Sequence, residues 1–258
     1  FSALIKKINA DVSSQFTIHV GDIKNGANTC SDERFLSVKK LFDEFTQALV
    51  YTPGDNEWTD CHRKNNGAYE PQERLTKIRE LFFKQKNSFG KRTIPLEHQP
   101  SVQPEFSAYI ENTRWIQNDV LFVTLHQVGS NNNKDPDIVG AISEFQLRNK
   151  ANMAWLQSAF QLAKQRQSQA IVIAMQSDSF DAYIPKDSGY TEFNTTIAQL
   201  SREFDKPVLI IQGDSHRYVL NQPFKDSRGV VSNLWRLVVP GANLVEAVQI
   251  TINTDASN

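Results

Sequence analysis

The chain has 258 residues, of which 40% are apolar and 22% charged, and its formal net charge is −1. These fractions are ordinary for a globular protein with one substantial core. A net charge close to zero gives no indication of a nucleic-acid-binding protein. No apolar run reaches the roughly 20 residues of a membrane-spanning helix. The two cysteines, Cys30 and Cys61, are too few for a disulfide scaffold or a cysteine-built zinc site.

The sequence begins with a helical stretch, and strands then alternate with amphipathic helices. Apolar β-branched runs predict strands at 16–20, 48–52, 113–116, 120–126, 170–175, 207–212, 234–239 and 245–252. Apolar residues at helical spacing predict helices at 32–47, 71–84, 148–166 and 191–204. The alternation predicts a parallel sheet with helical crossovers, and turns at 117–119 and 240–243 add antiparallel pairs. The irregular stretches 85–111 and 131–142 are long for loops, so we expect them to cover a site.

Polar side chains follow four of the predicted strands directly. These strand ends read Gly21-Asp22, Gly54-Asp55, Gln176 and Gly213-Asp214, and His216 follows the last of them. Because ligands bind outside the carboxyl ends of strands in open α/β sheets, we expect these side chains to lie along one edge. A Gly-Asp pair after a strand is also an ordinary turn. Three carboxylates held close together would, however, repel one another until a divalent cation or a proton neutralises them.

The strand-end residues lie in three segments, which occur in the order HVGDIKNG, YTPGDNEWTDCHR and LIIQGDSHRY, together with Gln176. In this combination they resemble the calcineurin-like metallophosphoesterases, which include the purple acid phosphatases. The resemblance covers nearly the whole chain and implies a single α/β (α+β) domain over residues 1–258, with two mixed β-sheets sandwiched between helices in four layers. The family's D-x-H motif lies on a strand before the first helix. The resemblance therefore implies that this N-terminal first strand is missing from the sequence.

The resemblance also implies a centre of two divalent ions, held by Asp22, Asp55, Gln176, Asp214 and His216. Asp22 matches the family's bridging carboxylate, and His216 matches a ligand of the first ion. The positions of the second ion read as oxygen donors throughout, so we expect Mn, Mg or Ca there, with Fe or Zn as the alternative.

The resemblance assigns further roles to residues beside these ligands. Asn56 stands where the family has its proton-donating histidine, and asparagine cannot act as a general acid. His62 is either a substitute acid or a solvated loop histidine. Arg63 and Arg217 are the candidates to hold phosphate oxygens. Lys24 is a third candidate, although a surface-loop role is open for all three and best suits Lys24.

Two cysteines follow the loops that carry Asp22 and Asp55. If those strands are neighbours, a Cys30–Cys61 disulfide is geometrically possible and would indicate a secreted or periplasmic protein. Two reduced thiols would fit a cytosolic one instead.

Three functional hypotheses follow from the sequence. The first is a metal-dependent phosphoesterase that hydrolyses a phosphate mono- or diester with metal-activated water. The second is a degenerate relative that binds a metal or ligand without hydrolysis. The third is a metal-free interaction domain.

Overall fold

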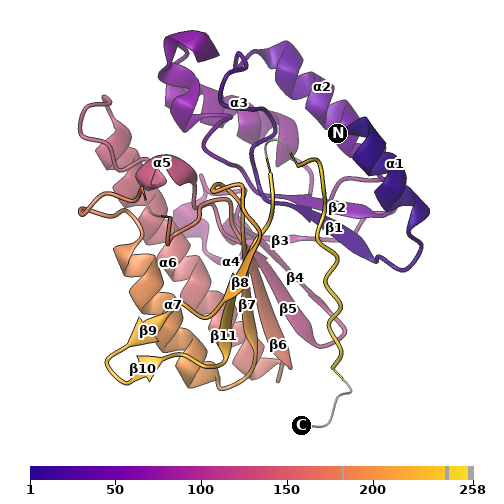
Figure 1. The fold of residues 1–258 in the computed structure, drawn as a ribbon, viewed down its shortest axis with the longest axis vertical. Helices are drawn as coiled ribbons and strands as arrows, with labels where there is room; N and C mark the ends of the chain where they lie inside the picture. The colour runs from indigo at the N-terminus through magenta and orange to yellow at the C-terminus, as the bar shows by residue number, and fades with distance from the viewer. Residues whose placement is uncertain (182, 242–243, 255–258) are drawn as a thin grey trace.

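A seven-stranded mixed sheet forms the centre of the protein in a computed structural model that describes residues 1–181, 183–241 and 244–254 (Figure 1). In spatial order its strands are β3 (Glu97–His98), β4 (Thr113–Gln117), β5 (Val120–Thr124), β6 (Ala170–Ala174), β7 (Val208–Gln212), β11 (Leu234–Val238) and β8 (Val219–Asn221). The run β5-β6-β7-β11 pairs in parallel, and the outer pairs are antiparallel. The carboxyl ends of β6 and β7 therefore lie at the same edge.

A second sheet consists of two parallel strands, β1 (Phe16–His19) and β2 (Ala48–Tyr51). A short hairpin, β9 (Lys225–Asp226) and β10 (Gly229–Val230), lies apart from both sheets. Because β1 and β2 run in the same direction, the loops that follow them also leave from one edge.

Helices cover the sheets, and two of them begin at residues whose side chains cap the first turn. The helices are α1 (Ser2–Ala10), α2 (Asp32–Phe42), α3 (Pro71–Phe82), α4 (Gln99–Val102), α5 (Gly129–Asn132), α6 (Ala141–Gln165) and α7 (Thr191–Phe204), with short 3₁₀ turns η1 (Thr59–His62), η2 (Lys64–Asn66) and η3 (Pro104–Phe106). The capped helices are α2 and α3. The Ser31 side chain accepts a hydrogen bond from the Arg34 N–H at the start of α2. Pro71 occupies the first turn of α3, where no backbone donor is needed.

Alternate residues of the central sheet pack on opposite faces. Leu121 and Ile171 belong to the core with α6 and α7, whereas Phe122 and Val172 pack with residues of β1 and β2. Phe42 belongs to a third cluster, which joins α1, α2 and α3 to the two-stranded sheet. The mixed α/β class predicted from the sequence is confirmed.

Most predicted elements are present with ends shifted by a few residues. Helix α6 begins at Ala141 rather than 148, and α2 ends at Phe42 rather than 47. The strand predicted at 245–252 is wrong, because β11 already pairs with β7 and β8 and leaves no free edge for a hairpin partner. The turn predicted at 240–243 lies partly outside the described residues. Within the described residues, no helix combines the length and apolar character needed to cross a membrane.

Candidate functional site

The strand ends of both sheets meet at a single polar residue, Gln176. It follows β6, and its amide nitrogen donates hydrogen bonds to Asp22 Oδ2 at 3.2 Å and to Asp55 Oδ1 at 3.0 Å. Asp22 follows β1 and Asp55 follows β2, so this amide joins loops from the two sheets. The prediction that these three side chains lie together is confirmed by their contacts.

Two glycines allow this close approach. A Cβ on Gly21 would lie 2.6 Å from the Gly54 backbone nitrogen, and a Cβ on Gly54 would lie 2.5 Å from the Asp22 nitrogen. Gly21 also has φ 83°, which other residues adopt only with strain. Packing therefore requires glycine at both positions, and the positive φ of Gly21 adds a backbone requirement there.

Asp214 reaches the same place through a residue that the sequence reasoning missed, Gly129. A Cβ on Gly129 would lie 2.6 Å from Asp55 Oδ2 and 2.7 Å from Asp214 Oδ1. Both carboxylates therefore face the Gly129 backbone. We refer to the carboxylates of Asp22, Asp55 and Asp214 as the acidic centre.

A left-handed turn at residues 130–133 borders the acidic centre. Its four residues have φ between 49° and 60°, a conformation that costs about 1–2 kcal/mol per residue outside glycine. Ser130 Oγ lies 2.8 Å from Asp55 Oδ2 and 2.8 Å from Asp60 Oδ1. The run Gly-Ser-Asn-Asn-Asn is the available sequence signal, because asparagine tolerates this conformation best among residues with side chains.

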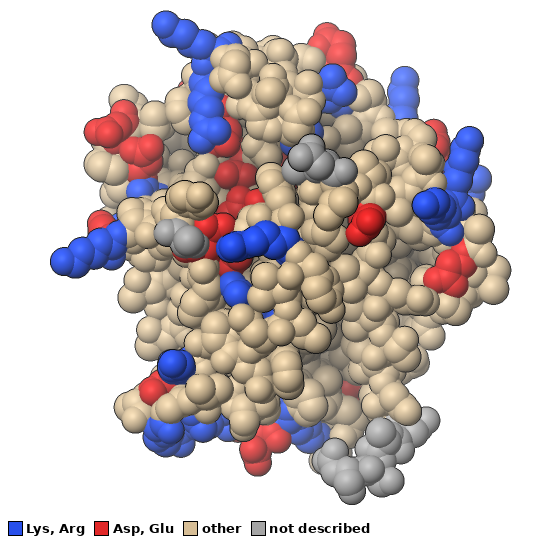
Figure 2. Space-filling view, in the orientation of Figure 1, with Lys and Arg blue, Asp and Glu red and all other residues tan. Residues whose placement is uncertain are grey.

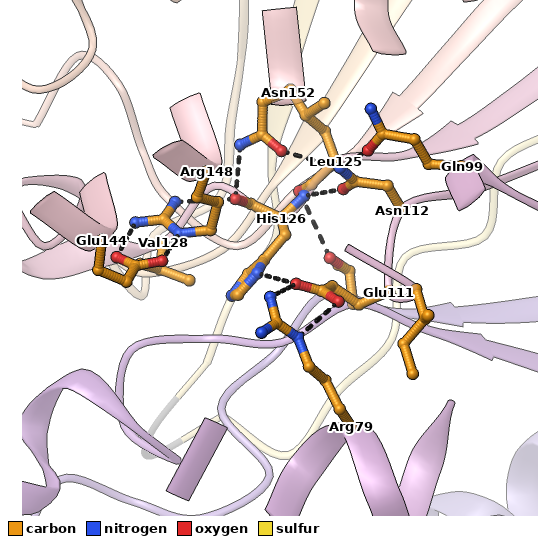
Figure 3. A network of polar contacts seen from close by, with 12 residues as sticks. Arg79, Gln99, Glu111, Asn112, Leu125, His126, Val128, Glu144, Arg148 and Asn152 are labelled. Atoms are coloured by element: carbon orange, nitrogen blue, oxygen red, sulfur yellow. Dashed lines mark hydrogen bonds and ion pairs between the residues drawn. The ribbon is translucent and has the colours of Figure 1, made fainter. Parts of the chain in front are cut away.

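A buried polar network, which Figure 3 shows around Arg148 and His126, anchors the left-handed turn. The Arg148 guanidinium, fully buried, donates to Asn132 Oδ1 at 2.6 Å, to the Asn132 carbonyl at 2.9 Å and to the His126 carbonyl at 3.0 Å. Glu144 accepts from the same guanidinium at 2.7 Å. Tyr190 adds a hydrogen bond from its hydroxyl to the Val128 carbonyl at 2.8 Å. Helices α6 and α7 thus fix the loop that borders the acidic centre.

The same network contains a buried pair, Glu111 and His126, whose ring nitrogen Nδ1 lies 2.7 Å from Glu111 Oε1. Burial alone would raise the pKa of Glu111, but the Arg79 charge and the hydrogen bond from His126 hold that pKa well below its usual range. His126 was assigned no role from the sequence. Its carbonyl accepts hydrogen bonds from Arg148 and Asn152, so His126 helps to hold the segment before the left-handed turn.

The electrostatics of the acidic centre favour added positive charge. Burial and the charges of Asp55 and Glu57 raise the pKa of Asp22 well above its ordinary value. Burial and the Asp55 charge likewise raise the pKa of Asp214 to about 8. Asp22 Oδ1 is buried and has no hydrogen-bond partner in the described part of the chain. Figure 2 shows acidic side chains gathered on this face, with basic side chains around them.

Two further carboxylates surround this centre. Burial raises the pKa of Glu57 to about 7, while hydrogen bonds from Gly54 N–H and Tyr51 oppose the shift. Burial and the Asp55 charge raise the pKa of Asp60 to about 6. Each of them therefore adds to the unfavourable accumulation of negative charge.

Lys24 does not lie in a surface loop, which corrects the sequence interpretation. Its side chain is only 5% exposed, and its ammonium donates to the Asn25 carbonyl at 3.1 Å. Burial lowers the pKa of Lys24, although the charges of Glu57 and Asp60 oppose the shift. Lys24 is therefore a buried cation beside the acidic centre.

The remaining predicted residues lie further out. Arg63 is exposed and pairs with Asp60 at 2.6 Å, so it reaches Asp55 only through Asp60 and Ser130. His62 is part-buried, with Nδ1 2.7 Å from the Thr59 carbonyl. Arg217 is exposed and lies 3.9 Å from Asp181.

Among the described residues, the side chains of His216 and Asn56 also make no hydrogen bond to the acidic centre. His216 is exposed, and its ring packs against Gly241, where an added Cβ would lie 3.0 Å away. The Asn56 side chain faces Gly26, with Oδ1 3.1 Å from a Cβ added there.

A disulfide joins Cys30 and Cys61, with their Cα atoms 5.8 Å apart. Cys30 lies in the loop after Asp22, and Cys61 lies in η1 after Asp55. The pairing considered from the sequence is present, and it ties together the two loops that carry these aspartates.

Comparison with protein-family models gives no match, and comparison with curated proteins gives no significantly similar relative. Across residues 1–181, 183–241 and 244–254, no group of three or more His, Cys, Asp or Glu side chains stands in metal-binding geometry. The acidic centre is thus a cluster held together by an amide, a hydroxyl and glycine backbone. A pocket of about 630 Å³ lies elsewhere, between α6 and residues 188–192, and none of the predicted site residues lines it.

Proposed function

We propose that this chain is a metal-dependent phosphoesterase that hydrolyses a phosphate mono- or diester. The observation that carries the proposal is the convergence of Asp22, Asp55 and Asp214 from three strand ends, with one buried carboxylate oxygen unpartnered among the described residues. Such a cluster is costly without a cation. The resemblance of the surrounding segments to calcineurin-like metallophosphoesterases supports the same activity.

The packing of the two sheets supports the family's fold. Phe16 and Val50 of the two-stranded sheet share a core with Phe122 of the central sheet, and helices pack on the outer face of each. The proposal includes the four-layer arrangement of two sheets between helices. The smaller sheet, expected to be mixed, is a parallel pair in the described residues.

The donor atoms of the acidic centre are carboxylate oxygens, the type of ligand that a hard divalent cation prefers. Mn, Mg or Ca is the proposed cofactor at Asp22, Asp55 and Asp214. Iron or zinc would need an imidazole ligand, and His216 would have to turn from its packing on Gly241 to supply one. A bound cation would lower the pKa of water and neutralise the charge that develops on phosphorus oxygens.

The chain's own residues then bind and orient the substrate. Arg217 is exposed beside the Asp214 loop, and Arg63 is exposed beside the Asp55 loop, so both are free on one side to hold phosphate oxygens of a phosphorylated small molecule. His62 is the candidate proton donor to the leaving group.

The second candidate is a binding relative without hydrolytic activity. Two observations favour it: the Gln176 amide nitrogen stands between two of the proposed ligands, and Asn56 cannot donate a proton as an acid. The disulfide supports an exported location in either case.

The test is hydrolysis of p-nitrophenyl phosphate and bis(p-nitrophenyl) phosphate with Mg, Mn, Ca, Fe or Zn. The proposal predicts turnover with Mn or Mg. Asp22→Ala is expected to lower that turnover by about 100-fold or more, the usual effect of losing one electrostatic contact to the transition state. The control is Asp137→Asn, a change at an exposed loop residue. Absence of turnover with every cation, together with retained cation binding, would favour the binding relative. Absence of both would favour a metal-free interaction domain.

A further inference from the structure

Gln176 has an orientation that its neighbours dictate. The Gly129 N–H donates to Gln176 Oε1 at 2.5 Å. A backbone N–H can only donate, so a flipped amide would bring two donors face to face. The oxygen of Gln176 is therefore committed to Gly129, and the amide nitrogen faces Asp22 and Asp55.

Gln176 also has no room to change this orientation. Its side chain is fully buried, and a Cβ on Gly21 or Gly54 would lie 2.7 Å or 2.9 Å from its Cγ. Its backbone nitrogen donates to the Gln127 carbonyl at 3.2 Å, and its carbonyl accepts from Gly213 N–H at 2.8 Å. The side chain is thus held at its backbone, at its methylene groups and at its amide.

An amide nitrogen donates hydrogen bonds and offers no lone pair to a metal ion. In this position it supplies partial positive charge to Asp22 Oδ2 and Asp55 Oδ1. These are the two oxygens to which a cation between the two carboxylates would bind. Asp55 Oδ2 and Asp214 face the Gly129 backbone instead, and Asp22 Oδ1 has no hydrogen-bond partner among the described residues.

We infer that Gln176 closes the position between Asp22 and Asp55 to metal, so that the centre holds one divalent cation rather than two. This inference rests on the proposed function for the cation itself. The resemblance implied two ions with Gln176 as a ligand; the geometry instead makes Gln176 an internal hydrogen-bond donor that substitutes for the second ion. A single-ion centre lacks the paired clamp on attacking and leaving oxygens that two ions provide.

The test is the stoichiometry of Mn²⁺ binding, measured by isothermal titration calorimetry on the whole chain. The wild type is expected to bind one ion. Gln176→Glu replaces the donor by a carboxylate oxygen facing Asp22 and Asp55, so two ions are expected. The matched control is Gln199→Glu, the same change on α7, where the amide donates to Glu203 at 2.9 Å; it is expected to bind one ion.

Gln176→Ala covers the case in which the glutamate variant does not fold. It removes the amide without adding charge, and it is also expected to bind two ions, the second more weakly. Circular dichroism of each variant checks the fold.

The outcomes separate this inference from the proposed function. Two ions in the wild type, or one ion in the wild type and in both Gln176 variants, would overturn the inference and leave the phosphoesterase proposal standing. No ion in the wild type but one in the variants would support closure by Gln176 and overturn the proposed function. No ion in any protein would overturn both.

Discussion

Replacing Arg148 by methionine should destabilise the protein strongly, because its fully buried guanidinium joins several members of a polar network (Figure 3). Methionine fills a similar volume but leaves Glu144 without its ion pair at 2.7 Å and Asn132 without two hydrogen bonds, at 2.6 and 2.9 Å. Removal of one partner from a buried ion pair typically costs about 3–5 kcal/mol. The left-handed turn would lose its anchor at the same time.

The assay is urea unfolding at pH 7, followed by circular dichroism. The matched control is Arg217→Met, since Arg217 lies 3.9 Å from Asp181 with 57% of its side chain exposed. Exposed pairs of this kind contribute about 0–1 kcal/mol. A loss of less than about 1 kcal/mol for Arg148→Met, or a loss equal to that of the control, would refute the network as a major source of stability.

Three further predictions concern the core, the disulfide and the acidic centre. Burial lowers the pKa of His19 to about 4, so protonation of its ring opposes folding at acidic pH. The free energy of unfolding should be unaffected above pH 6.5 and should fall, by at most about 3 kcal/mol for this part-buried residue, as the pH approaches 4. In His19→Phe the free energy of unfolding should change less with pH across that window. Replacing Cys30 and Cys61 by serine should lower the unfolding free energy by roughly 3.5 kcal/mol, with reductant affecting only the wild type. Gly129→Ala places a Cβ against two carboxylates and should lower the unfolding free energy by about 1–3 kcal/mol. In the control Gly213→Ala, the added Cβ meets only ordinary contacts, at 3.4 Å or more, so the unfolding free energy should hardly change. Equal losses of unfolding free energy in the two variants would refute the packing argument.

The location of the acidic centre could be predicted from the sequence because strand direction and strand ends are local signals. Runs of apolar residues placed β1, β2, β6 and β7, and parallel pairing then brought their following residues to common edges. The hydrogen bonds between Gln176 and two aspartates also require the packing of the two sheets against each other.

The roles of individual side chains could not be predicted, because they depend on contacts between distant segments. The Gln176 orientation is set by Gly129, 47 residues away in the chain. The left-handed turn is held by Arg148, 16 residues further along the chain, and Lys24 is buried although a lysine in a loop is usually exposed. Neither periodicity nor composition reports such contacts.

The errors in element boundaries also have physical causes. The first two turns of α6, from Ala141 to Leu147, are largely part-buried or exposed, so they lack the apolar stripe that would reveal a helix. The chain at 245–252 has strand-like composition, but the neighbouring edge of β11 is already occupied. Intrinsic strand preference was thus overridden by the pairing of the sheet.

The central claim, a cation held by the acidic centre, is tested most directly by thermal unfolding of the wild type and Asp22→Asn with and without millimolar Mn²⁺. The account predicts that Mn²⁺ raises the wild-type Tm. It predicts that Asp22→Asn unfolds about 2–4 °C higher than the wild type without metal, because asparagine replaces a carboxyl whose charged form is costly in this buried site. It also predicts that the variant gains little from Mn²⁺. A wild-type Tm that no divalent cation changes, together with a less stable Asp22→Asn variant, would contradict the account.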